Sequence, residues 1–80
     1  MKGLVKMDLS TLLSWLPNED EDGWYFELRK QRGVLNETQW VCAKTNYRTN
    51  KEAFNNIGET PEEAVQKVLE DRLGYTLDKL

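Results

Sequence analysis

The chain has 80 residues, a formal net charge of −3, 39% hydrophobic residues and 10% aromatic residues. This length gives one domain with a single core over residues 1–80, and the apolar content favours a folded chain over a disordered one. Histidine is absent and Cys42 is the only cysteine, which excludes an intrachain disulfide and removes the commonest metal ligand and the usual general base. We therefore predict a non-enzymatic protein with no catalytic residues, no cofactor and no metal site.

Membrane association and export are not expected from the hydropathy pattern. The longest apolar runs are a few residues, far short of a bilayer span. The first six residues lack the apolar centre of a signal peptide. With one thiol, which in its apolar strand is typical of a small buried hydrophobe, the sequence predicts a cytoplasmic protein.

A short helix is expected near the N-terminus. Asp8 suits the N-cap position, and Met7 before it is placed to pack against Leu12 as a hydrophobic staple. Four leucines share one helical face, at the spacing i, i+3, i+4 and i+7: Leu9, Leu12, Leu13 and Leu16. Pro17 ends the helix, and Trp15 lies at the border of the leucine stripe.

Residues 18–23 form a polar loop with four consecutive carboxylates, Glu19, Asp20, Glu21 and Asp22. Their mutual repulsion favours a solvated loop. The spacing does not match a calcium-binding loop, and no distal bidentate Glu is suitably placed. The loop therefore predicts no metal site.

Two strands are predicted to form an antiparallel hairpin. In residues 24–30, Trp24, Phe26 and Leu28 alternate with polar or amphipathic neighbours, which is the period-two pattern of a half-buried strand. Residues 31–37 contain Gly33 and Asn36 and are interpreted as a turn, and residues 38–45 as the returning strand. The second strand is apolar on both sides, with Trp40 and Cys42 on one and Val41 and Ala43 on the other. Such a strand is central in its sheet or is covered on its second face.

A short third strand over 52–57 and a longer helix complete the predicted elements. Phe54 or Ile57 is expected to reach the core. The helix is predicted from Pro61 to about Leu73, because Thr60 suits the N-cap and Pro61 the first helical position. Glu63 is placed to accept a hydrogen bond from the N–H of Thr60.

The apolar stripe of this helix comprises Ala64, Val65, Val68, Leu69 and Leu73. Gly74 suits a left-handed residue at the end of the helix, and Tyr75 is expected to fold back onto Leu69. Leu77 and Leu80 are candidates to dock on the domain or on a second copy.

This element order predicts an α+β fold, with a short N-terminal helix, an antiparallel hairpin or three-stranded meander, and a C-terminal helix. Both helices on one sheet face give a two-layer sandwich. One helix on each face gives the alternative α/β/α sandwich, which the two apolar sides of strand 38–45 keep open.

Positive charge concentrates in the strands. Residues 24–51 carry six basic and two acidic side chains, a local charge of +4, whereas the remaining residues sum to −7. This hairpin provides candidate nucleic-acid-binding residues: Arg29, Lys30, Arg32, Lys44, Arg48 and Lys51. The competing interpretation is that these side chains protect exposed strand edges.

Three resemblances accompany these patterns. The α-β-β-β-α order resembles a double-stranded-RNA-binding domain. That family carries lysines where this chain has Pro61, Glu62, Glu63 and only a later Lys67, so the resemblance implies topology and not RNA binding. Gly58-Glu59-Thr60-Pro61-Glu62-Glu63-Ala64 resembles the strand-to-helix junction of HicB-type antitoxins.

The broadest similarity, over much of residues 24–73, is to small phage and prophage proteins with a helix, a Trp-containing hairpin and a Gly-x-Thr-Pro-Glu-Glu-Ala helix. Trp24 to Leu28, Gln39 to Ala43 and Gly58 to Leu69 carry it. The resemblance implies a phage-type origin more than a function.

The leading functional hypothesis is a phage-type protein–protein interaction module that binds a protein partner or self-associates. The acidic balance, the number of aromatic residues and the missing catalytic groups motivate it. Its contact surface is expected on the open sheet face or the acidic loop, with these candidate partner-binding residues: Glu19, Asp20, Glu21, Asp22, Tyr25 and Tyr47. The alternative is a nucleic-acid-binding module that uses the basic hairpin 24–51.

Overall fold

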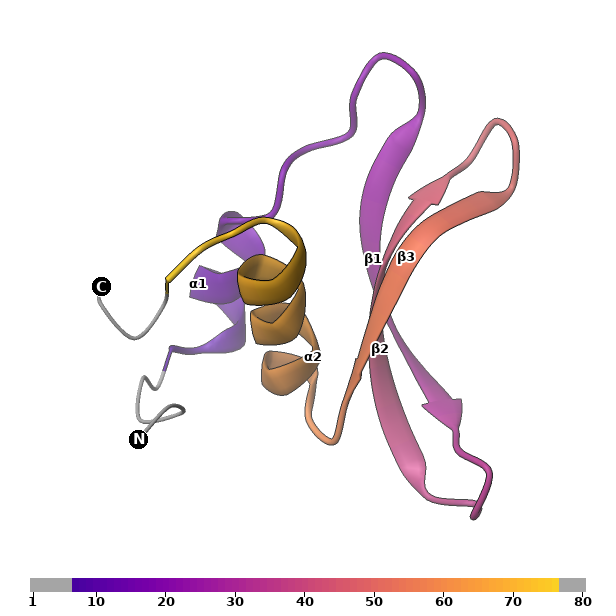
Figure 1. Cartoon of the computed structure of the whole chain (residues 1–80), viewed down its shortest axis with the longest axis vertical. Helices are drawn as coiled ribbons and strands as arrows, with labels where there is room; N and C mark the ends of the chain where they lie inside the picture. The colour runs from indigo at the N-terminus through magenta and orange to yellow at the C-terminus, as the bar shows by residue number, and fades with distance from the viewer. Residues whose placement is uncertain (1–6, 77–80) are drawn as a thin grey trace.

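The computed structural model describes residues 7–76, which form two helical segments and a three-stranded sheet (Figure 1). The elements in chain order are α1 (Leu9–Ser14), β1 (Trp24–Arg32), β2 (Thr38–Asn46), β3 (Lys51–Gly58) and α2 (Pro61–Lys67), which continues as a π-helical segment, η1 (Val68–Arg72). The predicted elements are all present. Of the two expected sheet arrangements, the three-stranded meander is the one that forms.

The sheet is antiparallel, with the order β1-β2-β3 and β2 in the middle. β1 pairs with β2 without interruption from Trp24 opposite Asn46 to Arg32 opposite Thr38. β2 and β3 pair with one register shift, between Lys44 and Thr45. The strands are longer than predicted at both hairpin ends, because the ladder continues into the polar residues that flank each turn.

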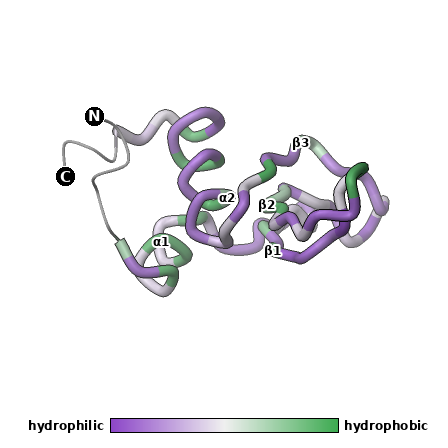
Figure 2. The backbone as a smooth tube through the Cα atoms, turned by 90° about the horizontal axis from the view of Figure 1, so that it is seen from below, coloured by the Kyte–Doolittle hydropathy of each residue, from purple (hydrophilic) through white to green (hydrophobic). Residues whose placement is uncertain are grey.

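Both helices lie on the same side of the sheet (Figures 1 and 2). α2 packs against β2 and β3, and α1 packs on α2 farther from the sheet. One buried cluster joins these layers: Leu12, Cys42, Ala64, Val65, Val68 and Leu69, with Phe26, Leu28, Trp40 and Phe54 packed against it. The fold is therefore an α+β two-layer sandwich, and the α/β/α alternative is wrong.

The two apolar sides of β2 have a different explanation from a second helical layer. Val41 and Ala43 point away from the helices, yet they are 1% and 0% exposed. They lie between β1 and β3, so the side chains of both neighbouring strands cover them. A central strand buries small apolar residues on its open face in this way, so of the two expected explanations the central position is the one that applies.

α1 begins as predicted, but its buried face contains fewer leucines than predicted. The Asp8 carboxylate accepts a hydrogen bond from the Thr11 N–H at 2.8 Å, which is an N-cap. Leu12 is fully buried, whereas Leu13 is 39% exposed, so its predicted place on the buried face is wrong. The helix has only six residues and meets a single neighbouring helix, which leaves room for one leucine row.

The start of α2 matches the sequence prediction except for one bond. The Thr60 hydroxyl accepts a hydrogen bond from the Glu63 N–H at 3.1 Å, and Pro61 holds the first helical position. The Glu63 carboxylate accepts from the N–H of Glu59, not from that of Thr60. It also pairs with Lys67 at 3.3 Å one turn later.

Replacing Thr60 with Ala is expected to lower the free energy of unfolding by about 1 kcal/mol, because the Glu63 N–H loses its acceptor. The midpoint of thermal unfolding should fall by roughly 4–8 °C. Thr49→Ala, an exposed threonine in the β2–β3 turn, is the matched control and should leave the midpoint unchanged. Equal midpoints for both variants would place the helix start elsewhere.

The end of the second helix departs from a simple α-helix. Residues Val68–Arg72 form a π-helical turn, in which the Leu73 N–H bonds to the Val68 carbonyl five residues earlier. Gly74 then adopts φ +77°, as predicted, and the Tyr75 N–H bonds to the Leu69 carbonyl at 2.9 Å. The wider turn still brings Leu73 against the core.

The remaining predictions for aromatic and apolar residues concern Phe54, Ile57, Trp15 and the C-terminal leucines. Phe54 packs on the core, whereas Ile57 is 40% exposed on the open sheet face. The ring of Trp15 lies 5.6 Å from that of Tyr75, at the border of the helical layer. The predicted docking of Leu77 and Leu80 lies outside the described residues.

Candidate functional site

The acidic loop between α1 and β1 is fixed at the end of the sheet by Asp20. One carboxylate oxygen of Asp20 accepts hydrogen bonds from the N–H groups of Asp22 and Trp24, at 2.9 and 3.1 Å. The Asp20 N–H also donates to the Trp24 carbonyl, and the Asp20 carbonyl accepts from the Gly23 N–H. Asp20 therefore holds the loop, while the side chains of its three acidic neighbours lie on exposed residues.

Asn46 ties the acidic loop to the turn between β2 and β3. It is 4% exposed, and its side-chain amide donates to the Asp22 carbonyl at 3.0 Å. Its side-chain oxygen accepts from the N–H groups of Arg48 and Thr49, at 2.8 and 3.1 Å. One buried amide thus satisfies three backbone groups from two loops.

Tyr47 and Arg48 cover the same corner. Gly23 has φ +95°, and a Cβ atom there would lie 3.1 Å from both the Tyr47 ring and the Arg48 side chain. The Arg48 guanidinium lies over the Tyr47 ring at 5.5 Å, and its Nε donates to the Tyr47 hydroxyl at 3.3 Å. This hydrogen bond to Tyr47, together with the nearby carboxylates of Asp22 and Glu19, raises the pKa of Arg48.

The structure brings the predicted partner-binding residues to one end of the sheet. Tyr25 pairs with Thr45 in the ladder, and the Tyr47 N–H bonds to the Gly23 carbonyl at 3.1 Å, two residues farther along. Tyr25 and Tyr47 are therefore diagonal neighbours on the open sheet face, at the end where the acidic loop enters β1. We call this surface the acidic corner: Glu19, Asp20, Glu21, Asp22, Tyr25 and Tyr47.

The six predicted nucleic-acid-binding residues do not gather on one surface. Arg29 lies on the open sheet face, whereas Lys30 and Lys44 lie over the rings of Trp40 and Trp24 on the helical side. The remaining three are at the strand ends: Arg32 bonded to Asn36, Arg48 in the β2–β3 turn and Lys51 at the start of β3. The register places Lys30, Arg32 and Lys44 on the helical side of the sheet and Arg29 on the opposite face.

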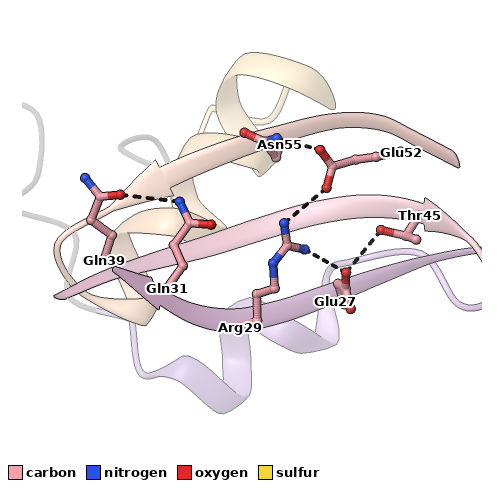
Figure 3. Close-up of polar contacts among 7 residues, drawn as sticks. All are labelled: Glu27, Arg29, Gln31, Gln39, Thr45, Glu52 and Asn55. Atoms are coloured by element: carbon pink, nitrogen blue, oxygen red, sulfur yellow. Dashed lines mark hydrogen bonds and ion pairs between the residues drawn. The ribbon is translucent and has the colours of Figure 1, made fainter. Parts of the chain in front are cut away.

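A network of polar side chains, which was not predicted from the sequence, covers the open sheet face (Figure 3). Arg29 pairs with Glu27 at 2.7 Å on its own strand and with Glu52 of β3 at 3.3 Å. Thr45 donates to Glu27, and Asn55 donates to Glu52 at 2.6 Å. The hydrogen bond from Asn55, followed by Arg29, lowers the pKa of Glu52.

In this network Arg29, one of the predicted nucleic-acid-binding residues, is neutralised by two carboxylates of its own chain. Glu27 and Arg29 are about one-third exposed, so each ion pair adds little stability. Together they cover Val41 and Ala43, which lie beneath them on β2. The alternation at Glu27 and Arg29 was a visible signal, but the partner on β3 depends on the β2–β3 register.

The chemistry of the other candidate groups is limited. Cys42 is fully buried in the core, and burial raises the pKa of its thiol to about 11, so it is a poor nucleophile. Within residues 7–76, no three side chains of the metal-ligating types are arranged to hold a metal ion. In that same range, every helix is too short or too polar to cross a bilayer.

Comparisons with known proteins add no relative: no family model, no curated protein and no solved structure matches this chain.

Replacing Asn46 with Ala is expected to destabilise the domain by about 2 kcal/mol, because the backbone groups of Asp22, Arg48 and Thr49 each lose their bond to the Asn46 side chain in a poorly solvated place. Exchange of the Arg48 and Thr49 amide hydrogens should become faster, which NMR measures directly. Asn18→Ala, at an exposed position of the acidic loop, is the control. An unchanged melting curve and unchanged exchange for the Asn46 variant would contradict this account.

Proposed function

We propose that this chain is a small, non-enzymatic protein-interaction module that binds a basic protein surface through the acidic corner. The observation that carries the proposal is the anchoring of four consecutive acidic residues beside two tyrosines at one end of the sheet. A loop that is already fixed loses little conformational entropy on binding. Tyrosine supplies contact area with few rotatable bonds, and the carboxylates attract a basic partner over a distance.

A protein partner fits the charge distribution better than a nucleic acid. The chain is negative overall, and the exposed acidic side chains at the corner repel phosphates. Arg29 is engaged by Glu27 and Glu52 on the open face. Of the other basic residues, Lys30, Arg32 and Lys44 lie on the helical side of the sheet, and Arg48 and Lys51 lie at the β2–β3 turn. A phosphate backbone would therefore meet at most part of this charge in one orientation.

The partner that we propose is a host protein with a Lys/Arg-lined groove of the kind that binds nucleic acid. A compact row of exposed carboxylates presents negative charge of similar density to such a groove. The resemblance of residues 24–73 to small phage and prophage proteins supports a host protein as the target. This origin is part of the proposal.

The experiment compares capture of host proteins by the wild-type chain and by two charge-matched variants, from a nuclease-treated lysate. The first variant neutralises the acidic corner but keeps Asp20, which holds the loop: Glu19→Gln, Glu21→Gln and Asp22→Asn. The second removes the same charge elsewhere: Glu59→Gln, Glu62→Gln and Asp71→Asn. Circular dichroism confirms that all three chains are folded.

The expected result is a protein that the wild type and the second variant retain, that the first variant loses, and whose capture weakens as salt is raised. Equal capture by all three chains would overturn the acidic corner as the binding surface. Salt-sensitive binding of the purified chain to RNA or DNA that is lost on replacing Arg29, Lys30 and Arg48 with Ala would favour the nucleic-acid alternative.

A further inference from the structure

The outer edge of β1 carries unpaired backbone groups at alternate residues. In an antiparallel ladder, opposite residues alternate between pairs that exchange hydrogen bonds and pairs that do not. The backbone bonds from Tyr47 to Gly23 and from Gly33 to Glu37 fix this alternation, because both pairs continue the β1–β2 register. Odd-numbered β1 residues therefore bond to β2, and even-numbered residues direct their N–H and C=O groups outward.

Only the first part of this edge is covered within the described residues. Asp20 occupies the outward groups of Trp24, since it accepts from the Trp24 N–H and donates to the Trp24 carbonyl. Farther along, the outward backbone groups of Phe26, Leu28 and Lys30 have no partner within residues 7–76. A regular strand edge of this kind is a template for pairing with another strand.

The opposite edge of the sheet is protected. β3 has a register shift against β2 at Lys44 and Thr45, which distorts its first half. In its second half, the Lys67 ammonium of α2 donates to the Ile57 carbonyl at 2.9 Å. β1 has neither device, since its nine residues pair with β2 without a shift. Figure 2 shows β1 at the margin of the sheet with the helices to one side.

We propose that β1 pairs with β1 of a second copy of this chain, antiparallel and with the two-fold axis at Leu28. This register sets Glu27 opposite the partner's Arg29, and the symmetry repeats the pair. Leu28 meets its own copy on the helical side, next to the core. Phe26, Leu28 and Lys30 then exchange about six backbone hydrogen bonds with the partner strand.

The charge pattern of β1 favours this register over the registers in which the two-fold axis is shifted by one residue. Moving the axis by one residue sets Glu27 opposite the partner's Glu27, or Arg29 opposite the partner's Arg29. Like charges directly opposite in an antiparallel pair are destabilising, whereas opposite charges are favourable. Around Leu28, the sequence of β1 is thus complementary to itself. The resulting dimer has a continuous six-stranded sheet, with the two acidic corners at opposite ends of the interface.

The experiment measures self-association of two single charge reversals, separately and mixed. Glu27→Arg places a second positive charge opposite the partner's Arg29, and Arg29→Glu places a second negative charge opposite the partner's Glu27, so each variant repels itself. When the two variants are mixed, each cross-strand pair at these positions joins opposite charges again. Loss of the ion pairs within each chain cannot account for such a rescue, because in the mixture each chain still carries its own substitution.

We expect the wild type to dimerise in sedimentation velocity between about 1 μM and 1 mM chain. Each single variant should raise the dimer dissociation constant at least about tenfold, and the equimolar mixture should restore a heterodimer. Glu52→Gln is the matched control: it also removes a carboxylate bound to Arg29, but from β3, and should leave dimerisation unchanged.

Lys30→Pro provides a second route if a charge reversal fails to fold. The Lys30 N–H points outward, so proline there removes a bond to the partner and blocks its approach while keeping the β1–β2 ladder. This variant should remain folded and become monomeric. A wild-type chain that is monomeric over the whole range, or a dimer that survives Lys30→Pro or is not restored by mixing, would overturn the proposal. This test does not depend on the acidic corner.

Discussion

Replacing Val68 with Asp is expected to unfold the domain at 25 °C. Val68 is fully buried in the cluster that joins the helical layer to the sheet, and a carboxyl group there lacks a polar partner. Burying such a group costs several kcal/mol whether it stays charged or takes up a proton. A core of this size supplies roughly 3–5 kcal/mol of stability in total. The substitution therefore removes most or all of it.

Loss of the near-ultraviolet circular dichroism signal and collapse of the dispersed amide NMR spectrum measure this outcome. Val34→Asp is the matched control, because it makes the same chemical change at a fully exposed position in the β1–β2 turn. The control should melt within a few degrees of the wild type. A Val68 variant with a cooperative transition close to that of the wild type would mean that α2 does not pack on the sheet through this residue.

Local rules were sufficient for most of the fold. The Thr60 cap, Pro61 and Gly74 bracket the second helix, and each acts on backbone groups no more than a few residues away. The alternation through Phe26 and Leu28 predicted the face of β1 that meets the helices. These features were predictable because the residues that determine them are close in sequence.

Features set by distant residues were not predictable in the same way. Glu63 turns to Glu59 and Lys67, a choice that depends on the path of the chain before the helix. The π-helical turn at the end of α2 carries no distinctive residue pattern, since it adjusts Leu73 to a core that only tertiary packing defines.

The candidate site was partly accessible from sequence. The four carboxylates of the acidic loop were visible, but their neighbour Tyr47 depends on the β1–β2 register. Asn46 offered a missed signal, because an asparagine that ends a strand before a turn often bonds to backbone groups ahead of it. Its third bond, to Asp22, joins residues 24 positions apart and was beyond local reasoning.

Two surfaces of the domain are separated by this architecture. The acidic corner lies at the end of the sheet where Asp20 covers the first outward groups of β1, whereas the uncovered edge begins two residues later. A basic partner at the corner and a second copy at the edge would therefore meet different atoms. Asp20 marks the boundary, because it both orders the acidic loop and ends the edge available for pairing.

Replacing Gly58 with Ala is the other large effect that we expect, a loss of about 2–3 kcal/mol in the free energy of unfolding. Gly58 ends β3 beneath the start of α2, and a Cβ atom there would lie 2.6 Å from the backbone nitrogen of Ala64. It would also lie within 3.0 Å of two atoms of Glu63. A helix backbone cannot yield as a side-chain tip does, so α2 must move away from the sheet.

Thermal unfolding should show this loss as a midpoint lower by roughly 10–20 °C. Gly33→Ala is the matched control, since the atoms nearest to a Cβ atom there belong to the exposed carboxylate of Glu37, which can swing aside. A Gly58 variant as stable as the Gly33 variant would show that α2 does not approach β3 this closely. A large loss at Gly58 and a small one at Gly33 would show that packing alone requires glycine before the capped helix start. Glycine at this position therefore needs no role in binding.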